Sequence, residues 1–427
     1  MLRTIVQGDP GFASELKALV DRARAVPGSI ETGARAIVED VRERGDVAVR
    51  MYTQRFEGRE LGAIELSRGE WQRLAAGASE EVRQALAQAA ARIRAYHEHE
   101  RYHSYETIEE GVRLACRYTP LARIGIYAPG GTARYPSTVL MTAVPAKVAG
   151  VREVFMTTPG PSPETLAAAL EAGVDRIFLM GGAQAVAALA YGTESVPRVD
   201  KIVGPGNAYV AAAKRLVFGD VGIEMIAGPT EVVIAADATA NPAWVAADLL
   251  AQAEHDELAV PILVAVGRAV AERVAQELDR QLAQLPRKAI AEKAIGNQGV
   301  AIVVADAESA IGLVNQLAPE HAGIALADAR KWADLVTCAG AVFVGDEACE
   351  ALGDYFAGPS HVLPTGGSAR FSSPLGVGDF LKRTSYIEYG AKAVAKQAGA
   401  VSCLAEVEGL SGHARAVLLR AQASAKP

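Results

Sequence analysis

The chain has 427 residues, of which 50% are hydrophobic and 22% charged, with a formal net charge of −7. This length is too great for one core and predicts about two to four domains. The acidic balance argues against a nucleic-acid partner, and the lack of an apolar run of about 20 residues argues against a membrane helix. The N-terminus has no signal-like apolar segment, so we expect a cytoplasmic protein.

The cysteines show no paired spacing of the kind that binds a metal through thiolates. In a reducing compartment we expect all of them to be small core residues rather than disulfides. They are Cys116, Cys338, Cys349 and Cys403.

Residues 11–103 are predicted to be mainly helical. Ser79 opens a long alanine-rich helix that runs to about Tyr102. Three histidines lie near its end, His97, His99 and His103. The glutamates and arginines around them favour a solvent-exposed face over a metal site.

Strands and helices alternate through the middle of the chain. Residues 112–118 alternate between apolar and polar side chains, which is typical of a strand. Short apolar strands are then predicted at 123–128, 153–157, 176–180, 199–203, 231–236, 260–265, 300–304, 321–325 and 340–344. Helical stretches separate most of them, so we expect a parallel α/β architecture of two tandem doubly wound units.

The amino-acid composition changes beyond residue 343. Residues 353–378 are rich in Gly, Pro and Ser and predict a long, ordered loop, which in a compact protein is often functional. Helices near 389–399 and 411–423 predict a small C-terminal tail.

Glycine-rich turns follow several predicted strands, at 128–134, 180–184 and 203–207. Glycine lets backbone N–H groups approach a phosphate, and open α/β sheets bind ligands at the carboxyl ends of their strands. Together the turns suggest a nucleotide site. Each turn alone is equally well explained as a tight connection, because no complete Gly-x-Gly-x-x-Gly occurs.

Asp248, Gln252 and His255 share one face of a helix that Asn241 and Pro242 are expected to begin. This face is either a solvated polar surface or half of a metal site. The other histidines that stand near carboxylates supply possible partners: Glu320 with His321, Asp354 with His361, and Glu408 with His413. Amide or carboxylate oxygen with imidazole nitrogen suits zinc, but spacing does not select one set of ligands.

Several longer segments resemble those of the histidinol dehydrogenase family and occur in the family's order. They are 181–194, 200–207, 227–231, 252–255, 319–321, 353–355, 361–365 and 408–413. The resemblance implies oxidation of L-histidinol to L-histidine through histidinal, with two NAD⁺ used in succession and one zinc ion per subunit. It also implies a homodimer whose tail completes the partner's active site.

The same resemblance implies a role for individual residues. The implied zinc ligands are Gln252, His255, Asp354 and His413, and the implied acid–base pair is Glu320 and His321. Substrate would contact these residues together with Thr230, His361 and Glu408. The nicotinamide cofactor would contact Tyr127, Gln184 and Asn207. Asp248 has no counterpart in this set and is interpreted as structural.

We therefore expect two incomplete Rossmann-like units with a helical N-terminal segment at 1–24. Residues 25–123 plus 233–376 would form the first unit, with most of the metal and catalytic site. Residues 124–232 would form the second, cofactor-binding unit, and 377–427 the tail that reaches the partner. A related zinc- and NAD-dependent dehydrogenase of another amino or sulfonated alcohol, a zinc hydrolase and a non-catalytic metal-binding protein remain alternatives.

Overall fold

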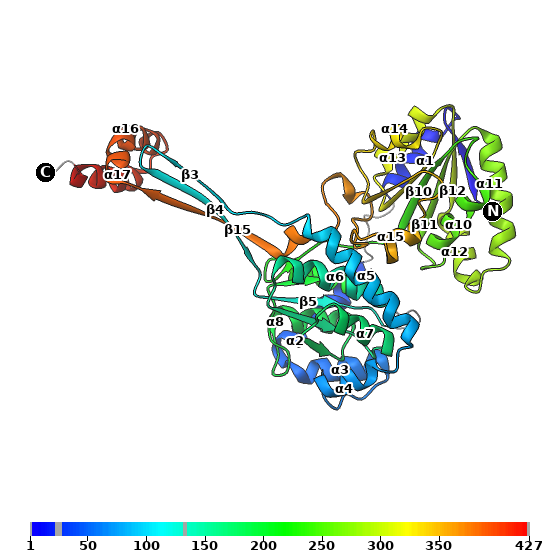
Figure 1. Ribbon diagram of the computed structural model, residues 1–427, viewed down its shortest axis with the longest axis horizontal. Coiled ribbons are helices and arrows are strands. Elements are labelled where there is room, and N and C mark those ends of the chain that lie inside the picture. The colour runs from blue at the N-terminus through cyan, green and yellow to red at the C-terminus, as the bar shows by residue number, and fades with distance from the viewer. Residues whose placement is uncertain (1, 22–27, 131–134, 425–427) are drawn as a thin grey trace.

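The computed structural model describes the chain except residues 1, 22–27, 131–134 and 425–427. It contains two α/β units and a tail that a long ribbon carries away from them (Figure 1). The predicted fold class is confirmed, and every predicted strand is present within a few residues. The described residues contain no helix that is both long and apolar enough to cross a bilayer.

The first unit, called the β5 unit after its central strand, has one six-stranded sheet. Its order is β2 (Glu65–Leu66), β7 (Arg176–Phe178), β6 (Glu153–Thr157), β5 (Arg123–Tyr127), β8 (Lys201–Val203) and β9 (Gly222–Ile223). All neighbours are parallel except β2 and β7.

Helices cover both faces of this sheet. One face is covered by α4 (Arg68–Ala75), α5 (Glu80–Glu98), α6 (Pro136–Ala149) and α7 (Pro163–Glu171). The other is covered by α2 (Gly28–Arg44), α3 (Asp46–Glu57), α8 (Gly182–Tyr191) and α9 (Ala208–Val217).

The second unit, called the β10 unit, has a fully parallel six-stranded sheet. Its order is β1 (Arg3–Val6), β12 (Val300–Val304), β11 (Val260–Val266), β10 (Glu231–Ala236), β13 (His321–Ala325) and β14 (Ala341–Val344). On one face lie α10 (Pro242–Ala253), α11 (Arg268–Leu282) and α12 (Lys288–Gln298). On the other lie α1 (Phe12–Asp21), α13 (Ala307–Leu317) and α14 (Ala329–Ala333).

The structure corrects the predicted grouping of the N-terminal third. Helices α2 and α3 pack against α8 and α9, and α4 and α5 pack against α6 and α7, so residues 28–98 belong to the β5 unit rather than with 233–376. The N-terminal segment is not purely helical, because β1 pairs with β12 and α1 packs against α13 in the β10 unit.

The tail is larger than the predicted 377–427 because an earlier segment joins it. Strands β3 (Tyr105–Glu109) and β4 (Val112–Pro120) form an antiparallel ribbon with β15 (Leu381–Tyr389). At its end stand α16 (Ala391–Val407) and α17 (Ser411–Ser424), which pack on each other. The predicted loop at 353–378 is ordered. It begins within the short helix α15 (Glu350–Tyr355) and includes the 3-10 turns η1 (Ser368–Arg370) and η2 (Val377–Phe380).

Two smaller expectations are also corrected. His97 is not on a solvent-exposed face: it is 1% exposed, and its Nδ1 lies 2.9 Å from Glu100. Only Cys116 is a buried cysteine, whereas Cys403 on the tail is exposed.

Each sheet reverses its winding direction at one place, which is where open α/β sheets form a crevice at the carboxyl ends of their strands. In the β5 unit this place lies between β5 and β8, and in the β10 unit between β10 and β13. The crevice of the β10 unit holds Asp237, whose carboxylate accepts hydrogen bonds from the backbone N–H groups of Thr239 and Ala327.

Candidate functional site

The candidate site lies at the amino ends of β10 and β13, opposite to the crevice of that sheet. Thr230 immediately precedes β10, while Glu320 and His321 lie where β13 begins, and His321 is in register with Val232. The turn from α13 into β13 uses Ala318 in the left-handed conformation, with a φ of 48°. The parallel pairing therefore brings together residues that are about ninety positions apart in the sequence.

Gln252 and His255 approach the same place from the end of α10. The helix begins as predicted, with the Asn241 side chain accepting from the N–H of Ala243. It ends at Ala253, so His255 lies in the loop just beyond it rather than on its face. Gln252 is fully buried.

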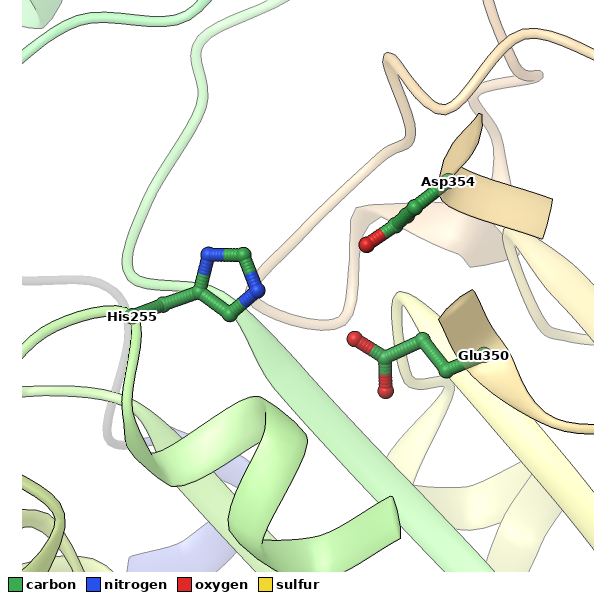
Figure 2. Close-up of side chains that lie close together, drawn as sticks. All are labelled: His255, Glu350 and Asp354. Carbon is green, nitrogen blue, oxygen red and sulfur yellow. The ribbon is translucent and has the colours of Figure 1, made fainter. Parts of the chain in front are cut away.

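Helix α15 contributes two carboxylates. Figure 2 shows Asp354 and Glu350 pointing toward the ring of His255. One ligand atom from each of these three residues lies within 4.8 Å of the other two. Gln252, His255 and Asp354, three of the four predicted ligands, thus meet in one chain, with Glu350 as an unpredicted neighbour.

A hydrogen-bond chain links the predicted metal and acid–base residues. Gln252 Nε2 lies 2.5 Å from Thr230 Oγ1, and Thr230 Oγ1 donates to Glu320 Oε2 at 2.6 Å. The backbone N–H of Glu231 donates to the same carboxylate oxygen at 3.0 Å. Burial raises the pKa of Glu320 to about 8, although these two donors favour its charged form.

The environment of His321 favours a neutral imidazole with one free ring nitrogen. Its Nδ1 lies 3.2 Å from the carbonyl oxygen of Glu231, so we assign the ring proton to Nδ1. Burial lowers the pKa of His321 to about 4, which keeps the imidazole uncharged at neutral pH. The free Nε2 faces Asp354 Oδ1 at 3.9 Å and is able to accept a proton from a bound ligand.

The orientation of the Gln252 amide bears on whether these residues suit a metal ion. With its nitrogen toward Thr230, its oxygen lies 2.9 Å from both carboxylate oxygens of Glu350. Such a contact between acceptors becomes favourable when a cation lies beside it, and otherwise the amide turns to donate to Glu350. Amide oxygen, imidazole and carboxylate are donors that zinc accepts together, so Gln252, His255 and Asp354 fit a divalent ion.

His361 is fixed from both sides of its ring. Its Nδ1 lies 3.0 Å from the carbonyl oxygen of Asp354, and its Nε2 lies 3.3 Å from Thr138 Oγ1 at the start of α6. Ser360 beside it donates to the carbonyl of Met141 in the same helix. These contacts attach the loop of the β10 unit to the β5 unit, and burial lowers the pKa of His361.

A cavity of about 1320 Å³ opens from this cluster. His321, Asp354 and His361 line one part of it, and Tyr118 and Arg383 at the root of the ribbon line another. The site is therefore accessible to a small ligand, with room left for further groups.

The predicted cofactor residues lie in the β5 unit, around the crevice between β5 and β8. Tyr127 ends β5, and its hydroxyl accepts from the N–H of Gly182 at 3.0 Å. Asn207 caps α9 by accepting from Tyr209 and Val210. Gln184 is buried, and its Oε1 has no hydrogen-bond partner among the described residues. An unpaired buried acceptor at a glycine-lined crevice fits a polar ligand such as a dinucleotide.

The turn before Asn207 is held by a buried ion pair. Lys214 on α9 lies 2.7 Å from Glu224, and the two side chains are 2% and 1% exposed. Gly204 joins both: its N–H donates to Glu224, and its carbonyl accepts from Lys214. The φ of Gly204 is +114°, and a Cβ there would lie 2.3 Å from the carbonyl oxygen of Tyr127, so only glycine fits.

Two predicted site residues do not reach the cluster within one chain. Glu408 and His413 are exposed on the tail. Figure 1 shows α16 and α17 at the end of the molecule opposite to α10 and α15.

Known proteins of one family resemble this chain in both sequence and structure. The sequence profile described as histidinol dehydrogenase matches residues 20–421. The chain belongs to the histidinol dehydrogenase family. It is 48% identical to a histidinol dehydrogenase of Nitrosomonas europaea, over 99% of both chains. It is 49% identical to one of Dechloromonas aromatica, over 98% of this chain and 99% of that one. The crystal structure of histidinol dehydrogenase from Elizabethkingia anophelis superposes with a TM-score of 0.92 at 36% identity, covering 99% of this chain and 98% of that one.

Sequence reasoning missed several residues of this histidinol dehydrogenase-family site. Glu350 is buried and faces the predicted ligands, but in the sequence it resembles any acidic residue at the start of a helix. Thr138 faces His361 from a helix whose residues are nearly all buried, so no periodicity marks it. The strong apolar character around Lys214 was the one available signal for a buried cation.

Proposed function

We propose that the chain oxidises L-histidinol to L-histidine through histidinal, using NAD⁺ twice and one zinc ion per subunit. Membership of the family supports the overall reaction, which is part of histidine biosynthesis. The observation that carries the residue roles is the meeting of Gln252, His255 and Asp354 with the pair Glu320 and His321. The cytoplasmic location stays a prediction.

Gln252, His255 and Asp354 would hold the zinc ion within one subunit, and His413 of a second copy would complete the set. When bound, zinc would hold the imidazole and amine of the substrate, and the nicotinamide would take up hydride. The side chains of this chain then have to orient the alcohol carbon and move protons.

His321 would take the proton of the alcohol in the first oxidation. Its Nε2 is free and neutral, while the carbonyl of Glu231 holds Nδ1–H and so fixes the ring. Glu320 would take a proton from the water that adds to the aldehyde, giving the hydrate that the second oxidation converts to the acid. Thr230 and the N–H of Glu231 would stabilise the carboxylate in that role.

The substrate's remaining polar groups would be bound by His361 and by Glu408 of the second copy. The tail exposes large apolar side chains, with Leu404, Val407 and Ile387 at 67%, 81% and 71% exposure. Apolar surface of this kind is typical of a protein interface, which supports a homodimer with shared active sites.

NAD⁺ would bind at the crevice between β5 and β8 with Tyr127, Gln184 and Asn207 in contact. The glycine turns there leave backbone room for a pyrophosphate, and α9 begins beside them. The hydrolase alternative has no use for such a crevice, and the alternative of another amino or sulfonated alcohol is decided by a substrate panel.

The test is formation of NADH from L-histidinol, followed by absorbance, in the zinc-loaded protein. His321→Ala is expected to reduce turnover by about a hundredfold or more, the usual contribution of a general base. His413→Ala is expected to lower both metal affinity and turnover, and His103→Ala, an exposed histidine, serves as the control. Near-normal rates in His321→Ala and His413→Ala, or a faster reaction with another alcohol, would overturn the assignment.

A further inference from the structure

Glu350 is a buried carboxylate to which the proposed reaction gives no role. It is 4% exposed and begins α15, one helical turn before Asp354. Both of its oxygens lie 2.9 Å from the outer amide atom of Gln252. Figure 2 shows its carboxylate directed into the space between His255 and Asp354.

Glu350 lies in a cluster of carboxyl groups that a divalent cation would stabilise. Three carboxylates gather here, from Glu320, Glu350 and Asp354, and their ion-pair partners among the described residues are the imidazoles of His321 and His361. Buried carboxylates without compensation are costly, whereas a divalent cation offsets two of them.

The donor set around Glu350 is complete within one chain. The imidazole of His255 and the carboxylates of Asp354 and Glu350 bring three ligand atoms within 4.8 Å of one another. Gln252, which lies 2.9 Å from the Glu350 carboxylate, would add a fourth with its amide oxygen toward the ion, the number that zinc takes in closed sites. Two carboxylates and one divalent ion also leave this set electrically neutral. His413, the fourth ligand of the proposed active site, lies on the distant tail (Figure 1).

We propose that Glu350 is an additional metal ligand, which allows a single chain to hold the divalent ion before a second copy supplies His413. This inference rests on the proposed zinc site. When the second copy docks, the imidazole of His413 takes the place of the Glu350 carboxylate. Glu350 then remains beside the ion without coordinating it, and the positive charge of the ion still offsets its carboxylate.

The test measures zinc rather than activity. Wild type, H413A, E350Q and the double variant H413A/E350Q are loaded with zinc and desalted, and their metal content and zinc affinity are measured with a chromogenic chelator. E347Q, an exposed glutamate of the same segment, is the control. Gln is close in shape to Glu, and circular dichroism together with the thermal midpoint verifies folding. Cobalt(II) absorption of H413A with and without E350Q gives an independent reading of the ligand set.

We expect H413A to retain about one zinc per chain with weaker affinity, and H413A/E350Q to bind at least about tenfold more weakly than H413A. The cobalt spectrum of H413A should change when E350Q is added and remain unchanged with E347Q. Equal zinc affinity and identical cobalt spectra in H413A and H413A/E350Q, or complete loss of zinc in H413A, would overturn the role of Glu350. A wild type that binds no zinc, or that binds zinc without oxidising L-histidinol, instead overturns the proposed function.

Discussion

The buried pair of Lys214 and Glu224 gives the sharpest prediction about stability. K214M removes the ammonium group and leaves the Glu224 carboxylate in an apolar interior, with its second oxygen already lacking a partner among the described residues. Removing one member of a buried pair costs about 3–5 kcal/mol, against about 0–1 kcal/mol for an exposed pair. We therefore expect K214M to lower the free energy of unfolding by about 3–5 kcal/mol.

The double variant K214M/E224Q separates the ion pair from the loss of packing. It removes both charges while the Gln oxygen still accepts from Gly204, so its cost should be below the sum of the single variants by about 2–3 kcal/mol. Urea unfolding followed by circular dichroism, at one fixed protein concentration, measures this. K293M is the control, because Lys293 and Glu257 form an equally short pair at 58% and 51% exposure.

A K214M cost no greater than that of K293M would refute this reasoning, as would strictly additive single variants. Since Gly204 is held by both members of the pair, K214M should also raise the NAD⁺ concentration needed for half-saturation.

Three further predictions concern backbone strain, ring orientation and pH. G204A should destabilise the fold and weaken NAD⁺ binding. Gly219 has a φ of +108°, but no atom lies within 4 Å of the position of its Cβ, so G219A should lower the free energy of unfolding by only about 1 kcal/mol. Equal losses for the two variants in urea unfolding would contradict the steric argument. Replacing Thr138 by Val should raise the KM for L-histidinol about three- to tenfold by removing the hydroxyl beside His361, and T138S should restore it; an unchanged KM in T138V would exclude this role. Burial raises the pKa of Asp248 to about 6 from its ordinary value of 3.8, so the stability that the protonated carboxyl group provides is lost as pH rises from about 4 to 6. The full shift would be worth about 3 kcal/mol, but Asp248 is only partly buried and solvent weakens the effect. D248N should therefore stabilise by only about 1–2 kcal/mol at pH 8 and by nothing at pH 3.5. Thermal midpoints that differ equally at both pH values would contradict this.

The strands could be predicted because each is a short, uninterrupted apolar run between turn residues, as buried parallel strands require. The assignment of the helices to one unit or the other could not be predicted. An amphipathic helix such as α2 shows which of its faces is buried, but not which sheet it covers. The sequence therefore groups residues 28–98 with the wrong unit, and it does not predict β1 because four residues carry little periodicity.

Residue chemistry and resemblance predict which residues form the candidate site, but they do not predict where it lies in the fold. The rule for open sheets points to carboxyl ends, which holds for Tyr127 and Asn207, but His321 lies at an amino end. Glu350 was missed because its burial depends on Gln252 and His255, which are about a hundred residues away and are invisible to a local pattern.

Asp237 has a consequence for the order of events in catalysis. Its carboxylate accepts hydrogen bonds from the backbone N–H groups of Thr239 and Ala327 at the crevice of the β10 unit, where those groups would otherwise be free to bind a phosphate. The negative charge of the carboxylate also repels an anion. The two oxidations of the proposed reaction then have to share the single crevice of the β5 unit. The first NADH must depart and a fresh NAD⁺ enter while the aldehyde stays bound, so the dwell time of the aldehyde has to exceed the time of cofactor exchange.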